Sequence, residues 1–161
     1  MSFRIGIGFD LHRLGPNTPL VIGGVLIPYA LGLIGHSDGD VLCHAITDAL
    51  LGAAGIGNIG ELFPDTDPAL KGMSSLRFLE KSIVLVRAKG FEVGNIDSNI
   101  LAERPKMLSY FPEMASKMAA ALGVTPDKIQ VKAKTMEGLG IVGTEQAIAA
   151  EAIALLVGGN L

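Results

Sequence analysis

The sequence predicts one domain of the α/β or α+β sandwich class. Stretches in which apolar and polar residues alternate, as in strands, are separated by longer stretches with helical spacing. The 161 residues suffice for one hydrophobic core, and we find no internal repeat or low-complexity segment that would divide the chain. Residues 1–161 are therefore expected to form a single domain.

The first element is expected to be a strand over residues 3–12. Its apolar side chains occupy odd positions and are predicted to face the core: Ile5, Ile7, Phe9 and Leu11. Asp10 and His12 project together from the other face, one pleat apart. That pair is either part of the solvent-exposed face of a strand or half of a functional site.

A strand pair near residues 20–29 is expected next, around a two-glycine turn. The stretch "HSDGDVLCHAITDALLGAAG" then predicts a helix with Ser37 as its N-cap. This helix is expected to end near Gly52 and Gly55. Its apolar positions resemble core, and the single cysteine, Cys43, is among them. The following segment, rich in Gly, Pro and Asp, is expected to be a loop over residues 56–73.

The rest of the chain alternates between the two patterns. The expected elements are a helix at 74–89 capped by Ser74, a strand at 91–103, a helix at 112–122 and a strand at 128–135. The tail at 144–157 is ambiguous, because its alanines favour a helix whereas its length and position also allow a closing strand.

Composition excludes some classes of function. A net charge of −3 argues against nucleic-acid binding through phosphate contacts. Residues 14–37 carry no Lys, Arg, Asp or Glu, but three prolines and five glycines interrupt them, so a membrane helix is not expected. Charged residues make up only 18%, which indicates either burial in an oligomer or a tight core of small residues. One cysteine allows no intrachain disulfide, and no signal peptide is seen.

The three histidines all fall within the first 44 residues, each near an acid. On the predicted helix Asp40, His44 and Asp48 share one face, which is usually a solvated face. Here no Lys or Arg between Arg13 and Lys71 offsets the acids, so a bound cation is plausible.

Asp10 and His12 of the strand, together with His44, would form an Asp-His-His set with an open fourth position. That set is typical of a catalytic Zn²⁺ site, although imidazole and carboxylate also suit other divalent ions. Asp40 or Asp48 could orient His44 from behind.

Other polar groups suggest phosphate chemistry. His36 and Ser37 are expected at a helix N-terminus, where backbone N–H groups can bind an anion. Thr135 and Glu137 follow a strand that carries Lys132 and Lys134, which fits a diphosphate with a hard cation held by Glu137. The stretch "GELFPDTDP" is either a surface turn or a loop that covers the hydroxyls of a ligand, and "AERPKML" is a candidate pocket for a base or sugar.

These segments together resemble a known family, the 2-C-methyl-D-erythritol 2,4-cyclodiphosphate synthases of the non-mevalonate isoprenoid pathway. The resemblance covers nearly the whole chain and rests on "GIGFDLHRL", "GGVLIPY", "HSDGDVLCHAITDALLGAAG", "IGELFPDTDP", "ILAERPKM", "VKAKTMEGLG" and "EAIALL". It implies a two-layer sandwich with a four-stranded mixed sheet, helices on one face, and a homotrimer with active sites between subunits. It also implies that the tail is a strand.

The resemblance further implies an activity and its residues. A CDP-linked methylerythritol 2-phosphate would be cyclised with release of CMP, with no role for nucleic acid or membrane. Asp10, His12 and His44 would bind Zn²⁺, and Glu137 would help to hold Mg²⁺ or Mn²⁺ on the diphosphate. His36 and Thr135 would stabilise the transition state. The substrate contacts would be Ser37 on phosphate, Asn58, Ile59, Gly60, Phe63, Asp65 and Asp67 on methylerythritol, and Ala102, Pro105, Lys106, Met107, Leu108, Ala133 and Lys134 on cytidine.

The chain departs from the family pattern at three positions. Asn58 stands where the family carries Asp, Thr144 where some members carry an arginine that lines the central cavity, and Lys134 where the bacterial pattern has Thr. A cytoplasmic location in a bacterium, or a plastid in a eukaryote, is expected. Two alternatives stay open: a metal-dependent phosphoesterase that uses bound water, and a trimeric metal- or nucleotide-binding module without catalysis.

Overall fold

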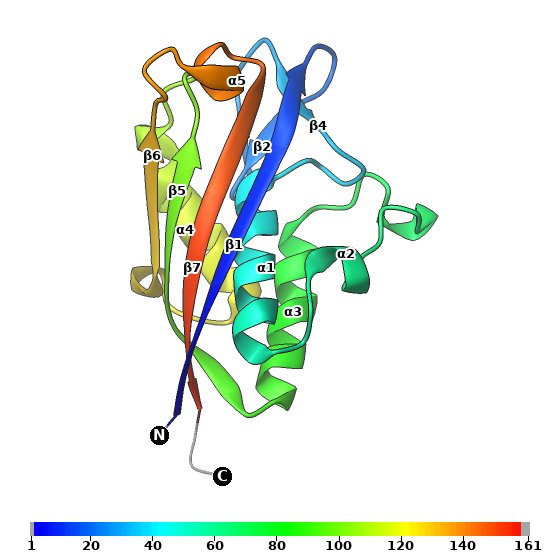
Figure 1. Ribbon diagram of the computed structural model, residues 1–161, viewed down its shortest axis with the longest axis vertical. Coiled ribbons are helices and arrows are strands. Elements are labelled where there is room, and N and C mark those ends of the chain that lie inside the picture. Colours follow the sequence, from blue (N-terminus) through cyan, green and yellow to red (C-terminus); the bar gives the residue numbers. More distant parts are fainter. Residues whose placement is uncertain (1, 159–161) are drawn as a thin grey trace.

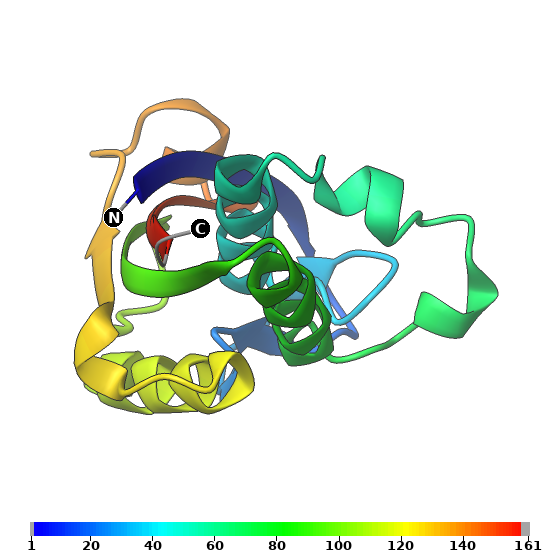
Figure 2. The same cartoon turned by 90° about the horizontal axis from the view of Figure 1, so that it is seen from below.

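The computed structural model describes residues 2–158, which form a mixed sheet covered on one side by helices (Figures 1 and 2). The strand order is β4-β1-β7-β5-β6, antiparallel except for the parallel pair of β5 and β6. The bounds are β1 Ser2–Gly15, β4 Gly32–Ile34, β5 Phe91–Leu101, β6 Ile129–Lys134 and β7 Ala147–Gly158. The sheet has five strands rather than the expected four, because β4 adds to the end of β1.

The alanine-rich tail forms β7, as the resemblance implied and as helix propensity did not. β7 lies in the middle of the sheet and pairs with both β1 and β5. Pairing on both edges satisfies its backbone groups, and its small side chains leave room for α1 (Val41–Ala54), which packs on β1 and β7. Tertiary contacts therefore override the local preference of alanine for helix.

The hairpin of β2 (Leu20–Ile22) and β3 (Val25–Ile27) confirms the expected strand pair. Its turn residues Gly23 and Gly24 both have positive φ. Their N–H groups donate to the carboxylate of Asp40, at 2.9 and 2.7 Å. The turn is thereby anchored to the start of α1.

The N-cap of α1 is Asp40, so the prediction of Ser37 was wrong. The Asp40 carboxylate accepts hydrogen bonds from the N–H groups of Leu42 and Cys43. Burial raises the pKa of Asp40, and the backbone N–H donors oppose that rise. Because Asp40 already accepts from these N–H groups, they are not free to bind the anion expected beside His36. Phosphate binding by His36 and Ser37 themselves stays a prediction.

The second long helix begins later than expected. It is α3 (Leu76–Ala88), whose N-cap is Ser75 and not Ser74. Ser75 makes no side-chain capping bond, and its own N–H donates to Asp38 at 2.9 Å.

The third long helix and the connecting loops complete the fold. α4 (Phe111–Leu122) carries Pro112 in its first turn, as predicted. The loop at 56–73 contains the short helix α2 (Ile59–Leu62), and α5 (Gly140–Gly143) precedes β7. Short 3₁₀ turns occur at Pro68–Leu70, Leu108–Tyr110 and Pro126–Lys128. Within residues 2–158 we find no helix with the length and apolar character needed to cross a membrane.

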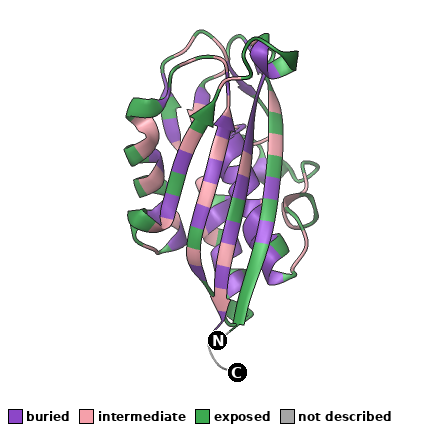
Figure 3. Cartoon of the chain, turned by 60° about the vertical axis from the view of Figure 1, so that its left-hand side comes forward, coloured by how far each residue is buried: buried purple, intermediate pink, exposed green. Residues whose placement is uncertain are grey.

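The apolar face of β1 is exposed, although it was predicted to face the core. The exposed fractions of Ile5, Ile7 and Phe9 are 73%, 66% and 57%. The buried face is the one that carries Gly6 and Gly8, because there α1 approaches the strand backbone. Figure 3 shows the opposite side of the sheet without a helix across it.

We expect Gly8→Ala to destabilise the fold by about 3 kcal/mol or more, since overpacking against rigid backbone cannot be relieved locally. A Cβ at Gly8 would lie 1.8 Å from the carbonyl oxygen of Ala45. Gly52→Ala is the matched control, because nothing lies within 4 Å of its added Cβ. There a helical alanine should be neutral or stabilise by up to about 1 kcal/mol. Urea denaturation measures both, and equal midpoints would contradict the close approach.

Candidate active site

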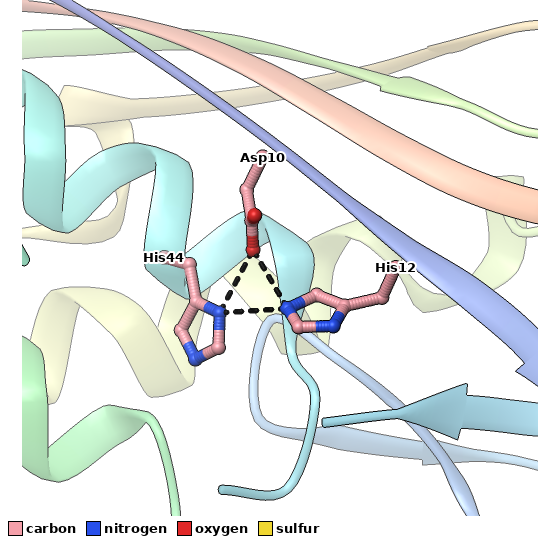
Figure 4. A group of neighbouring side chains, drawn as sticks. All are labelled: Asp10, His12 and His44. Atoms are coloured by element: carbon pink, nitrogen blue, oxygen red, sulfur yellow. Dashed lines mark hydrogen bonds and ion pairs between the residues drawn. The ribbon is translucent and has the colours of Figure 1, made fainter. Parts of the chain in front are cut away.

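Three side chains from two elements converge on one point beside the sheet (Figure 4). Asp10 and His12 extend from β1, and His44 extends from the first turns of α1. The Asp10 Oδ2 atom lies 2.8 Å from His44 Nδ1 and 3.0 Å from His12 Nε2. The two ring nitrogens are 3.3 Å apart. The structure therefore assembles the Asp-His-His set as the sequence predicted.

The donor set fits a divalent cation. One carboxylate and two imidazoles are ligands that zinc and related ions accept, and their atoms all lie within 4.8 Å of one another. His12 Nδ1 contacts the carbonyl oxygen of Ile34 at 2.8 Å, so Nδ1 carries the proton and Nε2 presents a lone pair to the centre. Burial raises the pKa of Asp10, but the contacts of its carboxylate with the rings of His12 and His44 outweigh that effect and hold the pKa well below its usual range.

The far side of the His44 ring meets two serines and no acid of its own helix. His44 Nε2 lies 2.8 Å from Ser75 Oγ and 3.1 Å from Ser37 Oγ. Asp40 is occupied by backbone N–H groups, and Asp48 accepts from the N–H of Ile59 at 2.7 Å. The prediction that Asp40 or Asp48 orients His44 was therefore wrong. Sequence reasoning missed Ser75, whose only signal was its place in the first turn of the helix predicted at 74–89.

A cavity of about 350 Å³ opens beside the three ligands and gathers most of the expected phosphate and methylerythritol contacts. Two residues that the sequence did not indicate, Leu70 and Phe78, complete its wall. The Phe78 ring stacks on that of Phe63 at 4.8 Å between centroids, which fixes one wall of the cavity. The expected residues in the lining are His12, His36, Ser37, His44, Ile59, Gly60, Phe63 and Asp65.

Asn58 and Asp67 are close in sequence to residues that line this cavity, but they are not part of the lining. Their side chains accept hydrogen bonds from nearby backbone N–H groups. Asn58 Oδ1 accepts from the N–H of Glu61 and caps α2, and Asp67 Oδ1 accepts from the N–H of Ala69. The carbonyl oxygen of Asp67 also lies 3.0 Å from His36 Nε2, which ties the loop at 63–70 to His36.

A second cavity, of about 260 Å³, gathers the residues expected to contact cytidine. Its lining also includes Glu103 and Phe111, which the sequence did not indicate. Glu103 accepts from the N–H of Met136 at 3.2 Å and so helps to hold the loop that carries Glu137. The expected residues in the lining are Ala102, Pro105, Lys106, Met107, Leu108, Ala133, Lys134 and Thr135.

Within one chain the two cavities are separate. Among the described residues they share no lining residue, and they lie toward opposite edges of the sheet, one by β1 and β4 and the other by β5 and β6. His36 and Thr135 therefore fall in different cavities. Thr135 Oγ1 donates to Glu137 Oε1 at 2.9 Å, so these two stay together, away from the Asp10 group. Lys132 is engaged by Asp97 at 2.6 Å.

Comparison with known proteins decides the family. A model described as the YgbB family matches residues 3–157. The chain belongs to the YgbB family. One YgbB relative, the 2-C-methyl-D-erythritol 2,4-cyclodiphosphate synthase of Photorhabdus laumondii, is 54% identical over 154 residues, which cover 96% of this chain and 98% of that protein.

Solved structures agree with the YgbB assignment. The bifunctional IspDF of Campylobacter jejuni superimposes with a TM-score of 0.95 at 43% identity, over 99% of this chain and 43% of that longer one. IspF of Plasmodium falciparum in complex with CDP superimposes with a TM-score of 0.86 at 34% identity, over 99% of this chain and 98% of that one. The YgbB fold described here is thus shared along the whole chain.

Proposed function

We propose that the chain cyclises 4-diphosphocytidyl-2-C-methyl-D-erythritol 2-phosphate to 2-C-methyl-D-erythritol 2,4-cyclodiphosphate and releases CMP. The observation that carries this proposal is the triangle of Asp10, His12 and His44 beside a cavity that can take a phosphorylated polyol. The synthase of Photorhabdus laumondii, to which the chain is 54% identical over 154 residues, supports the choice of substrate.

In this reaction an oxygen of the 2-phosphate attacks the β-phosphorus of the diphosphate, and the bond to the oxygen of CMP breaks. The nucleophile belongs to the substrate, so the protein needs no Ser or Cys nucleophile, which agrees with the full burial of Cys43. Catalysis then depends on position and on neutralised charge. Zn²⁺ held by Asp10, His12 and His44 would supply positive charge beside the phosphates.

The other residues act by holding the substrate. His36 and Ser37 line the metal cavity, where the Ser37 hydroxyl and the ring of His36, held through Nε2 by the carbonyl oxygen of Asp67, would contact phosphate oxygens. With substrate bound, the Thr135 hydroxyl, which here donates to Glu137, would donate to the diphosphate from the second cavity instead. Glu137 would then help to hold Mg²⁺ or Mn²⁺.

The ligand would span both cavities. We assign the methylerythritol to residues 58–60 and 63–67, and the cytidine to residues 102–108 and 133–135. Both lysines of the second cavity, Lys106 and Lys134, are placed to offset the charge of a nucleotide.

We also propose a homotrimer whose active sites lie between subunits. Two observations support it: the cavities for the two ends of the substrate lie toward opposite edges of the sheet, and β1 exposes an apolar face. A ring built from unlike edges would place the cytidine cavity of one subunit against the metal cavity of the next.

The decisive test is incubation of the protein and a divalent cation with the CDP-linked 2-phosphate, followed by phosphorus NMR. We expect a cyclic diphosphate and one CMP per turnover, and no reaction after metal is removed with a chelator. A linear monophosphate would instead indicate a phosphoesterase that uses bound water. Unchanged substrate, recovered in the bound form, would indicate a binding module.

A further inference from the structure

A pair of polar residues lies behind His44, away from the cation. Ser75 is fully buried at the start of α3, and its Oγ lies 2.8 Å from His44 Nε2. The same Oγ lies 2.5 Å from Oδ1 of Asp38. Asp38, Ser75 and His44 thus form one chain of hydrogen bonds that ends at the ring of a metal ligand.

The direction of each proton in this chain follows from the groups involved. A carboxylate only accepts, so the single hydroxyl proton of Ser75 is donated to Asp38. The Ser75 oxygen then has only lone pairs for His44, and His44 Nε2 must be the donor. Nδ1 of the neutral ring is left without a proton, and Nδ1 is the atom that lies 2.8 Å from Asp10.

We propose that Asp38 and Ser75 are positioning residues that hold His44 in the form protonated on Nε2 and so present Nδ1 to the cation. The proposal rests on the metal site of the proposed function. In metal sites generally, such partners of a histidine ligand fix the ring and raise metal affinity about 10- to 100-fold. Here the carboxylate acts through a serine hydroxyl rather than on the ring directly.

Asp38 also has a structural role, which the test must separate from the positioning role. Its Oδ2 accepts from the N–H of Ser75, and its Oδ1 accepts from the N–H of Asp40 at 3.2 Å. These bonds join the start of α3 to the segment before α1. Ser75→Ala keeps both backbone bonds and removes only the hydroxyl, so it isolates the effect on His44.

The test compares metal-free wild-type protein and Ser75→Ala for Zn²⁺ affinity, by competition with a chromogenic chelator. We expect the variant to bind Zn²⁺ at least about tenfold more weakly than the wild-type protein. We also expect a changed visible spectrum when Co²⁺ is the probe. The matched control is Ser74→Ala, since Ser74 is the exposed neighbour and should leave affinity and spectrum unchanged. Asp38→Asn should also weaken binding, because an amide can donate to Ser75 and turn the hydroxyl proton toward His44.

Several outcomes would overturn the inference. A lower melting temperature of metal-free Ser75→Ala with unchanged Zn²⁺ affinity would reduce Ser75 to a structural role. A larger loss of affinity in Ser37→Ala than in Ser75→Ala would assign the ring to Ser37, which lies 3.1 Å from Nε2. If wild-type protein bound no Zn²⁺, the proposed metal site itself would fail. If it bound Zn²⁺ and formed the cyclic product while Ser75→Ala matched it, only the positioning role would fail.

Discussion

Replacement of His44 by alanine is expected to abolish Zn²⁺ binding and to lower the rate of cyclic diphosphate formation by about a thousandfold or more. The imidazole is one of three groups around the proposed cation, and its Nδ1 lies within 3.3 Å of both other ligand atoms. Its loss leaves two ligands, which cannot close a tetrahedral site with one open position. Elemental analysis of the purified protein and CMP release measure the two effects.

Lys89→Ala is a suitable control for His44→Ala, because Lys89 is exposed at the end of α3 and should change neither quantity. Because His44 is mostly buried on α1, its loss could also affect folding. Circular dichroism separates the two effects, and we expect the spectrum of the folded protein. Bound zinc and CMP release that both matched wild-type protein would contradict the assignment of the metal.

Ile7→Glu is expected to break the proposed trimer into single chains and to stop cyclisation, while Zn²⁺ binding persists. Ile7 lies at the middle of the exposed apolar face of β1, between Ile5 and Phe9. An unpaired carboxylate buried there would cost several kcal/mol per subunit. Size-exclusion chromatography with light scattering should show a fall from about 50 kDa, three times the chain mass, to 16.7 kDa.

The matched control for Ile7→Glu is Val84→Glu. Val84 is 63% exposed, close to the 66% of Ile7, but it lies on α3 on the helical side of the sheet. It should therefore leave the mass unchanged. A wild-type protein that ran as a single chain, or an Ile7→Glu variant that kept the mass of three, would refute the proposed assembly.

The pairing of Asp10 with His12 could be predicted from the sequence because its geometry is local, whereas His44 comes from 32 residues beyond His12. Alternation places Asp10 and His12 on one face of a strand, and a helix brings His44 to the side of that strand. The resemblance to a family then named the set of ligands. The partners of His44 could not be found in this way, since Ser75 lies 31 residues after His44, at the N-cap of another helix, and no local pattern joins them.

The face of β1 shows why alternation alone was insufficient. Alternation separates the residues of a strand into two sets but does not say which set faces the helices. The apolar side chains of Ile5 and Ile7 led to the prediction that their face of the strand is buried in the core. The helix α1 instead lies over Gly6 and Gly8, where the lack of side chains permits close contact with the backbone. The prediction of Ser37 as the N-cap of α1 failed for a related reason. Ser and Asp are both favoured N-cap residues, and only the fold selects Asp40 over Ser37.

The contact between Gly8 and Ala45 also sets the dimensions of the metal site. Asp10 follows Gly8 by two residues on β1, and His44 immediately precedes Ala45 on α1. The separation of the two ligands is therefore fixed by backbone lying against backbone, with no side chain between to act as a compressible spacer. The proposed metal ligands are therefore mounted on a rigid junction of β1 and α1, which limits how far they can move to accommodate an ion.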